Sequence, residues 1–553
     1  MSNNRYTVTA ALLYANGPIH IGHLAGVYIP ADIFVRYLRR KNKDVIFICG
    51  SDEHGVPIMI GAQKEGISPK KIVDKYHFII KNSFNAFGIS FDNYSRTTSS
   101  MHHKTVTNFF KHLYHKNIFF EKTSKQFFDK ITGKFLADRY ILGNCPYCNN
   151  KAYGDQCEQC GSAISSDELI NPISALSGHI PILKKTKHWY LPLDKYQLFL
   201  ENWINNKKFW KTNVYGQVKS WLSIGLKSRS ITRDLDWGVS VPLNNAKGKV
   251  LYVWFDALIG YISSTIEWAE REGKNWVPYW KNDNTTLIHF IGKDNIVFHC
   301  IVFPVMLKAH GEYILPKNVI ANEFLNLENK KISTSKNWAV WLHEYLKDFP
   351  NQQDSLRYIL TINMPETKDN NFNWKEFQRR INSELVSVWG NFVYRIMVIT
   401  WKYCEGKVPT PQSISESDCK ILQLIKTYPS KIGTMIEHYR FRDALIHFMT
   451  LVRLGNKYLT NKEPWKIFNF NQKNIIYTAL QILGMLSQLA EPFFPNTTKI
   501  LLDSLHLKLY SWNELEKIEI LPPEHQLGEP ILLFKLIENS DIDKQLLKLK
   551  NNF

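Results

Sequence analysis

The stretch Tyr6–Arg40, YTVTAALLYANGPIHIGHLAGVYIPADIFVRYLRR, decides the fold of this 553-residue chain. Its first part, Tyr6 to Leu13, is the apolar run of a buried strand, and Asn16-Gly17-Pro18 ends that run with turn-forming residues. From Gly22 onward apolar residues recur at helical spacing, and arginines occupy the last turn, where the helix dipole favours cations. The stretch therefore predicts a buried strand followed by a long helix.

The strand pattern returns twice further along the chain. Asp44–Cys49 is a second short apolar run, so that strand, helix and strand would form a parallel pair. Thr285–Ile291 repeats the pattern much later and closes on Gly292-Lys293-Asp294. This recurrence predicts an α/β, doubly wound, Rossmann-like domain that is interrupted by an insertion.

The remaining patterns are helical. From about Asn382 apolar residues form helical stripes, including one that runs from Leu445 to Val452 and another from Ile482 to Leu489, which Pro492 stops. We expect an all-α bundle there, with a lysine-rich helical tail at 541–553. The expected parts are the first half of the nucleotide-binding fold at 1–117, the insertion at 118–226, the second half at 227–326, a connecting region at 327–381 and the helical domain at 382–553.

The charge balance indicates a polyanionic partner. The chain has 69 Lys+Arg against 50 Asp+Glu, which gives a formal net charge of +19. Nucleic acid is the first candidate, although a general excess of lysine in the sequence is an equally good explanation of the charge alone. The N-terminus lacks a signal-peptide core, and the longest apolar stretch, Ile296–Leu307, is too short to span a bilayer. We expect a cytoplasmic protein that does not bind a membrane.

Four cysteines form two C-x₂-C pairs, Cys145-Pro-Tyr-Cys148 and Cys157-Glu-Gln-Cys160. Thiolates at this spacing close a tetrahedron around Zn²⁺. Two disulfides are the alternative, which a reducing compartment disfavours. Because all four positions are thiolates, no site stays open for water, and the pattern predicts one structural zinc ion in a zinc knuckle within the insertion.

Two short motifs carry the chemistry. His20-Ile21-Gly22-His23 places imidazoles and a glycine at a helix N-terminus, and Lys331-Ile332-Ser333-Thr334-Ser335 places a cation and hydroxyl donors in a polar loop. Together they suit a nucleotide triphosphate that is held from two sides. For the histidines alone, the alternative is that they cap or pack at a turn.

In order and context these motifs resemble the paired signatures of class I aminoacyl-tRNA synthetases. From Ala10 through Gly66, and again at Tyr252–Tyr261 and Phe290–Asn295, the chain resembles the methionyl-tRNA synthetases, and the similarity covers essentially the whole chain. The resemblance implies that ATP, with Mg²⁺, and L-methionine form methionyl-adenylate, which then charges initiator and elongator tRNA(Met). Many members add an OB-fold tRNA-binding module that dimerises them; none is visible here, and we expect a monomer.

The resemblance also implies a set of site residues. The signature residues that act in catalysis would be His20, Gly22, His23, Lys331, Ser333, Thr334 and Ser335. ATP would be bound by His20, His23, Gly292, Asp294, Lys331, Thr334 and Lys336. Methionine would be bound by Leu12, Tyr14, Asp52, Trp254, Ala257, Tyr261 and His299. Asp52 would pair with the α-ammonium group, and the aromatic rings would enclose the thioether.

The second motif departs from the family's Lys-Met-Ser-Lys-Ser. Ile332 replaces methionine, and Thr334 stands where the second lysine is expected. The missing ammonium removes a phosphate contact worth about 1.5–3 kcal/mol. Lys336 and Lys330, on either side of the motif, are the candidates to replace it.

The helical domain offers candidates for reading RNA. Asn391 and Arg395 lie four residues apart and share a helix face, and Trp465 follows a proline that limits its backbone. Single-stranded bases are read by stacking on aromatic rings and by hydrogen bonds to their edges. The resemblance implies that these three residues meet the anticodon; for Trp465, packing on the bundle is the alternative.

Two other functions stay open at this point. One is another class I aminoacyl-tRNA synthetase, although the insertion is shorter than the editing domains of the isoleucine, leucine and valine enzymes. The other is a catalytically eroded, zinc-containing tRNA-binding protein, which Thr334 favours and the intact His20, His23, Asp52 and Trp254 disfavour.

Overall fold

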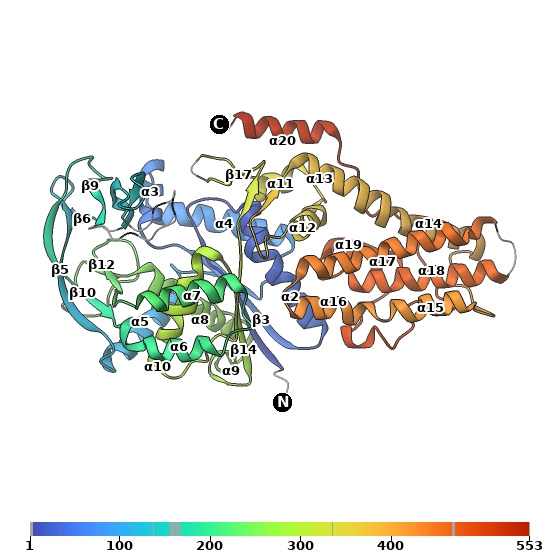
Figure 1. Ribbon diagram of the computed structural model, residues 1–553, viewed down its shortest axis with the longest axis horizontal. Coiled ribbons are helices and arrows are strands. Elements are labelled where there is room, and N and C mark those ends of the chain that lie inside the picture. The colour runs from blue at the N-terminus through green and yellow to red at the C-terminus, as the bar shows by residue number, and fades with distance from the viewer. Residues whose placement is uncertain are drawn as a thin grey trace.

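The structure of the protein is a computed structural model that describes residues 4–136, 138–154, 157, 160, 164, 168–334, 336–466 and 470–551. Figure 1 shows an elongated molecule, with an α/β body in the middle, a strand-rich insertion at one end and a bundle of helices at the other. No helix among these residues is long and apolar enough to cross a membrane.

A six-stranded parallel sheet forms the body. β1 (Arg5–Ala10) lies between β14 (Thr285–Gly292) and β3 (Asp44–Asp52). Outside them lie β15 (Asn318–Asn322), next to β14, and β2 (Leu13–Tyr14) and β4 (Asn93–Arg96), which both pair with β3. The strand order reverses between β1 and β14, and a crevice at the carboxyl ends of the strands at such a point is where doubly wound proteins bind ligands. The predicted fold class is confirmed.

The helix predicted from Gly22 is present but not uniform. It begins as α1 (Ile21–His23), continues as a π-helical segment, η1 (Leu24–Tyr28), and ends as α2 (Ile29–Arg40). Pro30 has no N–H to donate to the turn before it, and the wider turn of η1 accommodates its ring. The other helices of the body are α3 (Val56–Glu65), α4 (Pro69–Phe87), α5 (Ser100–His115), α8 (Val253–Glu272), α9 (Val277–Lys281), η5 (Lys293–Asn295), η6 (Phe298–Val302) and α10 (Phe303–His310).

The insertion is built on a long antiparallel pair, β5 (Phe120–Asp129) and β10 (Ile182–Leu191). β6 (Lys134–Phe135) and β11 (Arg229–Ser230) extend this pair into a four-stranded sheet. A smaller sheet carries the cysteines and consists of β7 (Ile141–Asn144), β8 (Lys151–Tyr153) and β9 (Ile170–Ser174). The remaining elements are η2 (Asp138–Tyr140), η4 (Leu193–Tyr196), α6 (Gln197–Asn205), α7 (Thr212–Ile224) and the pair β12 (Thr232–Arg233) and β13 (Val250–Leu251).

A small sheet and two helices connect the body to the bundle. The sheet consists of β16 (Leu325–Leu327), β17 (Lys330–Lys331) and β18 (Asn370–Phe372), and the helices are α11 (Leu342–Asp348) and α12 (Gln353–Ile362). The predicted helical stripes lie on α17 (Phe441–Lys462) and α18 (Phe470–Leu489) and are buried. The bundle and its approach comprise α13 (Trp374–Arg380), η7 (Ile381–Gly390), α14 (Asn391–Cys404), α15 (Glu416–Ile425), α16 (Tyr428–Glu437), α17 (Phe441–Lys462), η8 (Pro464–Lys466), α18 (Phe470–Leu489), α19 (Pro495–Ser504) and η9 (Trp512–Glu514).

A buried ion pair joins α2 of the body to α12. Arg357 donates to Asp32 at 2.8 Å, and neither side chain is exposed to solvent. Arg36 connects the same aspartate, at 2.8 Å, to Glu491 beyond α18, at 2.7 Å. Although burial alone would raise the pKa of Asp32, the two guanidinium groups and hydrogen bonds from Ser90 outweigh it and lower the pKa to about 2. The body and the bundle are thus held together by ionised groups.

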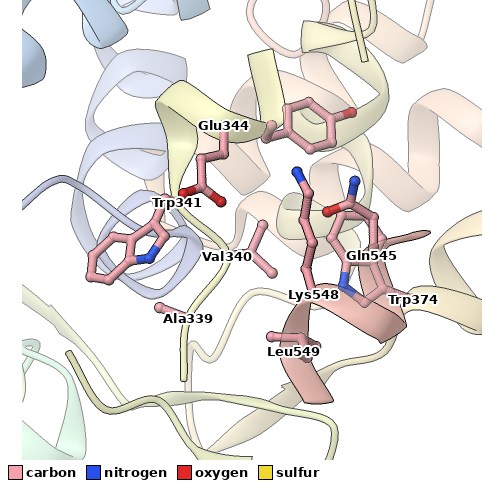
Figure 2. A pocket seen from close by; sticks show the side chains of 9 residues that line it. Ala339, Val340, Trp341, Glu344, Trp374, Gln545, Lys548 and Leu549 are labelled. Carbon is pink, nitrogen blue, oxygen red and sulfur yellow. The ribbon is translucent and has the colours of Figure 1, made fainter. Parts of the chain in front are cut away.

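The C-terminal tail is helical, as predicted, and it also docks on the connecting region. α20 (Asn539–Asn551) buries Ile542 and Leu549, and Gln545 donates to Asp348 of α11 at 2.9 Å. Figure 2 shows Gln545, Lys548 and Leu549 facing Val340 and Trp374 across a small pocket. The tail therefore contacts the segment that directly follows the second motif.

Candidate active site

The histidines of the first motif lie where β2 turns into α1, at the carboxyl edge of the sheet. Nδ1 of His20 accepts a hydrogen bond from the Gly22 amide at 3.1 Å, and Nδ1 of His23 accepts one from the His20 amide at 3.4 Å. Because each Nδ1 accepts, both rings carry their proton on Nε2. The two histidines therefore do cap the turn, as the alternative interpretation of the motif expected. The same hydrogen bonds fix the tautomer in which Nε2–H would face a phosphate.

Both imidazoles are neutral near pH 7. Burial, and then the charge of His23, keeps the pKa of His20 well below its ordinary value, and burial lowers the pKa of His23 to about 4. The rings stack with their centroids 3.7 Å apart. Each ring thus offers one N–H donor next to the amides of a helix N-terminus, which is an arrangement suited to phosphate oxygens.

The second motif lies directly against the first. A Cβ on Gly22 would lie only 3.1 Å from Cδ1 of Ile332. Behind this contact the backbones are joined: the Ile21 amide donates to Val340 at 3.1 Å, and the Leu342 amide donates to Ile19 at 2.9 Å. The structure therefore brings together two motifs that more than half of the chain separates.

The loop of the second motif is a short hairpin with lysines on both sides. Ser333 and Trp338 exchange backbone hydrogen bonds of 3.0 and 2.9 Å, which leaves the exposed Thr334 at the tip. The ammonium of Lys330 lies 5.0 Å from the ring centre of Trp338, and the exposed Lys336 follows the tip. Ser335 lies outside the described residues.

The end of β14 supplies the facing side of the crevice. A Cβ on Gly292 would lie 2.6 Å from Oδ1 of Asp294, so that only glycine fits there while this carboxylate keeps its position. Asp294 is exposed and interacts electrostatically with Lys331. The ammonium of Lys331 also lies 5.5 Å from the ring centre of Phe324. Asp294 therefore lies within electrostatic range of Lys331, which begins the second motif.

The predicted methionine-binding residues form one cluster around α8. Tyr261 donates to Nε2 of His299 at 2.8 Å, because Nδ1 of His299 donates to the Asn295 carbonyl at 3.0 Å. The ring centroids of Tyr14 and Trp254 are 6.5 Å apart, edge to face. Leu12 packs against α8, since its Cδ2 lies 3.0 Å from a Cβ built on Gly260. Ala257, one turn before Gly260 on the same helix, is buried.

Asp52 ends β3 and is only 3% exposed. Burial, and then the charge of Asp256, raises the pKa of Asp52 well above its ordinary value. A buried carboxyl of this kind needs a cation beside it to stay ionised. The position suits the α-ammonium group of an amino acid.

Three side chains of this region were not predicted from the sequence. Phe298 stacks face to face on Trp254, with ring centroids 3.7 Å apart. His54 pairs with Asp256 at 2.9 Å beside Asp52. In the sequence, Phe298 belongs to an apolar run that is typical of a buried core. His54 and Asp256 lie within the motifs that carry the family resemblance, but their pairing is visible only in the tertiary structure.

The four motif cysteines form a compact cluster that could hold a metal ion. Their sulfur atoms lie within 4.8 Å of one another, and the pairs Cys145–Cys160 and Cys148–Cys157 are 3.8 and 3.5 Å apart. All four are free thiols, which rules out the two disulfides. A tetrahedron of zinc–sulfur bonds of about 2.3 Å has edges of about 3.8 Å, so the donor set fits Zn²⁺.

The predicted anticodon residues meet at the far end of the molecule. Arg395 on α14 places its guanidinium 5.2 Å from the ring centre of Trp465, which lies in η8. Asn391 is exposed one turn before Arg395. Figure 1 places α14 in the bundle, on the side away from the insertion. An arginine and an indole side by side form a surface on which a base can stack.

Comparison with known families decides the identity. A family model described as tRNA synthetases class I (M) matches residues 6–397, and one described as the anticodon binding domain of methionyl tRNA ligase matches residues 408–551. The chain belongs to the methionyl-tRNA synthetase family. It therefore activates L-methionine with ATP and attaches it to tRNA. The alternative of another class I aminoacyl-tRNA synthetase is wrong.

Individual relatives agree with this assignment. The chain is 59% identical to the methionine–tRNA ligase of Christiangramia forsetii over 559 residues, which is 99% of this chain and 81% of that one. It is 57% identical to the enzyme of Bacteroides fragilis strain YCH46, with the same coverage. Its fold matches the crystal structure of Mycobacterium tuberculosis methionyl-tRNA synthetase bound by methionyl-adenylate, with a TM-score of 0.80 at 22% identity over 96% of this chain and 100% of that chain.

Proposed function

We propose that methionine is activated in the space bordered by the His20–His23 pair, the 331–336 hairpin and the end of β14. The contact between Gly22 and Ile332 carries this proposal, because it closes the two phosphate-binding motifs around one site. The methionine cluster lies around α8, and its Asp52 ends β3, the strand next to β1. An amino acid in that cluster would present its carboxylate toward the phosphate-binding motifs.

The protein itself has little covalent chemistry to perform in this reaction. The methionine carboxylate attacks the α-phosphorus of ATP, and pyrophosphate leaves with its bonding electrons. The Nε2–H groups of His20 and His23 donate to phosphate oxygens, and Lys331 balances the charge of the departing pyrophosphate. Mg²⁺ would accompany ATP, while Gly292 and Asp294 would border its nucleoside.

We propose Lys336 as the replacement for the absent second lysine of the loop. Lys330 lies beside the Trp338 ring, where a cation–aromatic contact holds it. Lys336 lies two residues after Thr334 within the hairpin turn and is exposed, so that its flexible side chain can turn toward the site. Ser333, Thr334 and Ser335 would add hydroxyl donors.

Two further sites would serve the tRNA. A structural Zn²⁺ held by Cys145, Cys148, Cys157 and Cys160 would stiffen the insertion, which would guide the acceptor end. Asn391, Arg395 and Trp465 would read the anticodon of initiator and elongator tRNA(Met). We propose that the protein works as a monomer in the cytoplasm, where its substrates are found.

Amino-acid-dependent exchange of ATP and pyrophosphate tests this function. We expect strong exchange with L-methionine and little with the other proteinogenic amino acids. Lys331→Ala should lower the exchange rate with little change in the KM for methionine. Normal exchange by this variant would refute the role given to the hairpin, and exchange with another amino acid but not methionine would refute the substrate.

A further inference from the structure

His54 touches two buried carboxyl groups at once. Its backbone amide lies 3.5 Å from Oδ1 of Asp52, and its ring Nδ1 lies 2.9 Å from Oδ2 of Asp256. The side chains of His54 and Asp256 are 3% and 0% exposed. Because the carboxyl groups of Asp52 and Asp256 are both buried away from water, a negative charge on one disfavours ionisation of the other.

The other charged and titratable groups around Asp52 are already balanced or neutral. The Glu53 carboxylate is held by Arg96 of β4 at 2.8 Å and lies 3.6 Å from His77 of α4. On α5, burial lowers the pKa of His102 and His103, which keeps these imidazoles neutral. On α8, burial raises the pKa of Tyr261 and keeps its phenol neutral. His54 lies 2.9 Å from Asp256, and the neutral His102 places a ring nitrogen within 4.8 Å of the same carboxylate.

We infer that His54 is a positioning residue that shares one proton with Asp256, so that the pair carries no net charge and Asp52 alone is ionised to receive the methionine ammonium group. Without His54, Asp256 and Asp52 compete for one negative charge, and Asp52 is protonated part of the time. This inference rests on the proposed assignment of Asp52.

The variants His54→Asn, Asp256→Asn and the double variant separate charge from packing. Asparagine keeps a hydrogen-bonding side chain of similar reach, but its amide does not gain or lose a proton near neutral pH. At about pH 7, His54→Asn should raise the KM for methionine, because Asp52 is then protonated part of the time. The KM for ATP should not change. The rise should shrink toward about pH 9, because a carboxyl with a raised pKa ionises as the pH increases.

The double variant gives the decisive result. Removing Asp256 as well removes the competing carboxyl, so the KM for methionine should return to within about threefold of the original. A double variant no better than His54→Asn, or a rise in KM that does not depend on pH, would show that the pair only fills space and would overturn the inference. Should His54→Asn not fold, His54→Gln should give the same rise in the KM for methionine, and a rise that does not depend on pH would overturn the inference.

Asp52→Asn separates this inference from the assignment beneath it. If Asp52 receives the ammonium group, this variant raises the KM for methionine at every pH. If its KM is unchanged, the assignment of Asp52 is wrong and the inference falls with it. If Asp52→Asn has the expected effect but the double variant gives no rescue, only the role of His54 is wrong.

Discussion

The Ile332 side chain lies so close to Gly22 that it would meet any Cβ at that position, although more than half of the chain separates the two residues. A methyl group at position 22 would lie 3.0 Å from the His20 ring and 3.1 Å from the Ile332 side chain. Gly22 does not have a positive φ, so the requirement for glycine comes from close approach and not from backbone strain.

Gly22→Ala should therefore slow activation. The added methyl group pushes the hairpin away from the histidines, and a misplacement of this kind costs about 10- to 100-fold in kcat. Exchange kinetics measure it, with Gly26→Ala as the control, because no atom lies within 4 Å of a Cβ at Gly26. Equal rates for the two variants would contradict the contact.

The two candidate lysines of the hairpin can be ranked by substitution. Lys336→Ala should lower kcat for exchange about tenfold or more, since a charged hydrogen bond is worth about 1.5–3 kcal/mol. Lys330→Ala should have a smaller effect, because Lys330 packs beside Trp338. Thr334→Lys should restore the rate of Lys336→Ala. A larger loss from Lys330→Ala would assign the role to Lys330.

The ion pair between Asp32 and Arg357 should contribute to the free energy of unfolding. Asp32→Asn leaves a fully buried guanidinium with reduced compensation, which costs about 3–5 kcal/mol. The surface variant Glu376→Gln, which removes the partner of the exposed Arg379 and of Arg380, should cost much less. Chemical denaturation followed by circular dichroism compares them, and equal losses would contradict the buried pair.

The lowered pKa of Asp32 predicts how acid changes the stability of the folded protein. The pKa of Asp32 is lowered to about 2 in the folded protein, against about 3.9 in an unfolded chain. Its contribution is therefore complete above about pH 4 and is lost as the pH falls toward about 2. The difference in unfolding free energy between the original protein and Asp32→Asn should shrink over this range.

Removal of the proposed zinc ion should affect tRNA charging more than exchange. The cysteine cluster lies in the insertion and shares a small apolar core with Val56 of α3. Chelation, or Cys148→Ser, should loosen this core and lower the charging rate, while exchange declines less. Zinc content by atomic emission gives the matching readout, with Cys419→Ser as the control outside the cluster. An unchanged charging rate after complete metal loss would contradict this role.

Trp465→Ala should weaken tRNA binding without touching activation. Loss of one stacking surface costs about 1–3 kcal/mol, which raises the KM for tRNA about 5- to 150-fold. Exchange without tRNA should be unchanged, because Trp465 lies in the helical domain and not beside the sheet. Normal charging by this variant would assign Trp465 to packing of the bundle.

The sequence by itself determined the local structure and the chemistry of each motif. The apolar run before Asn16-Gly17-Pro18 predicted a strand, the spacing after Gly22 predicted a helix, and the two C-x₂-C pairs predicted the cysteine cluster, because each pattern depends on residues that are close along the chain. Only the tertiary structure decided that Ile332 lies against Gly22, that His54 pairs with Asp256 and that α20 docks beside Trp374. Such contacts depend on how parallel strands and their crossover helices bring distant segments to one edge of a sheet, and short-range patterns do not record that path.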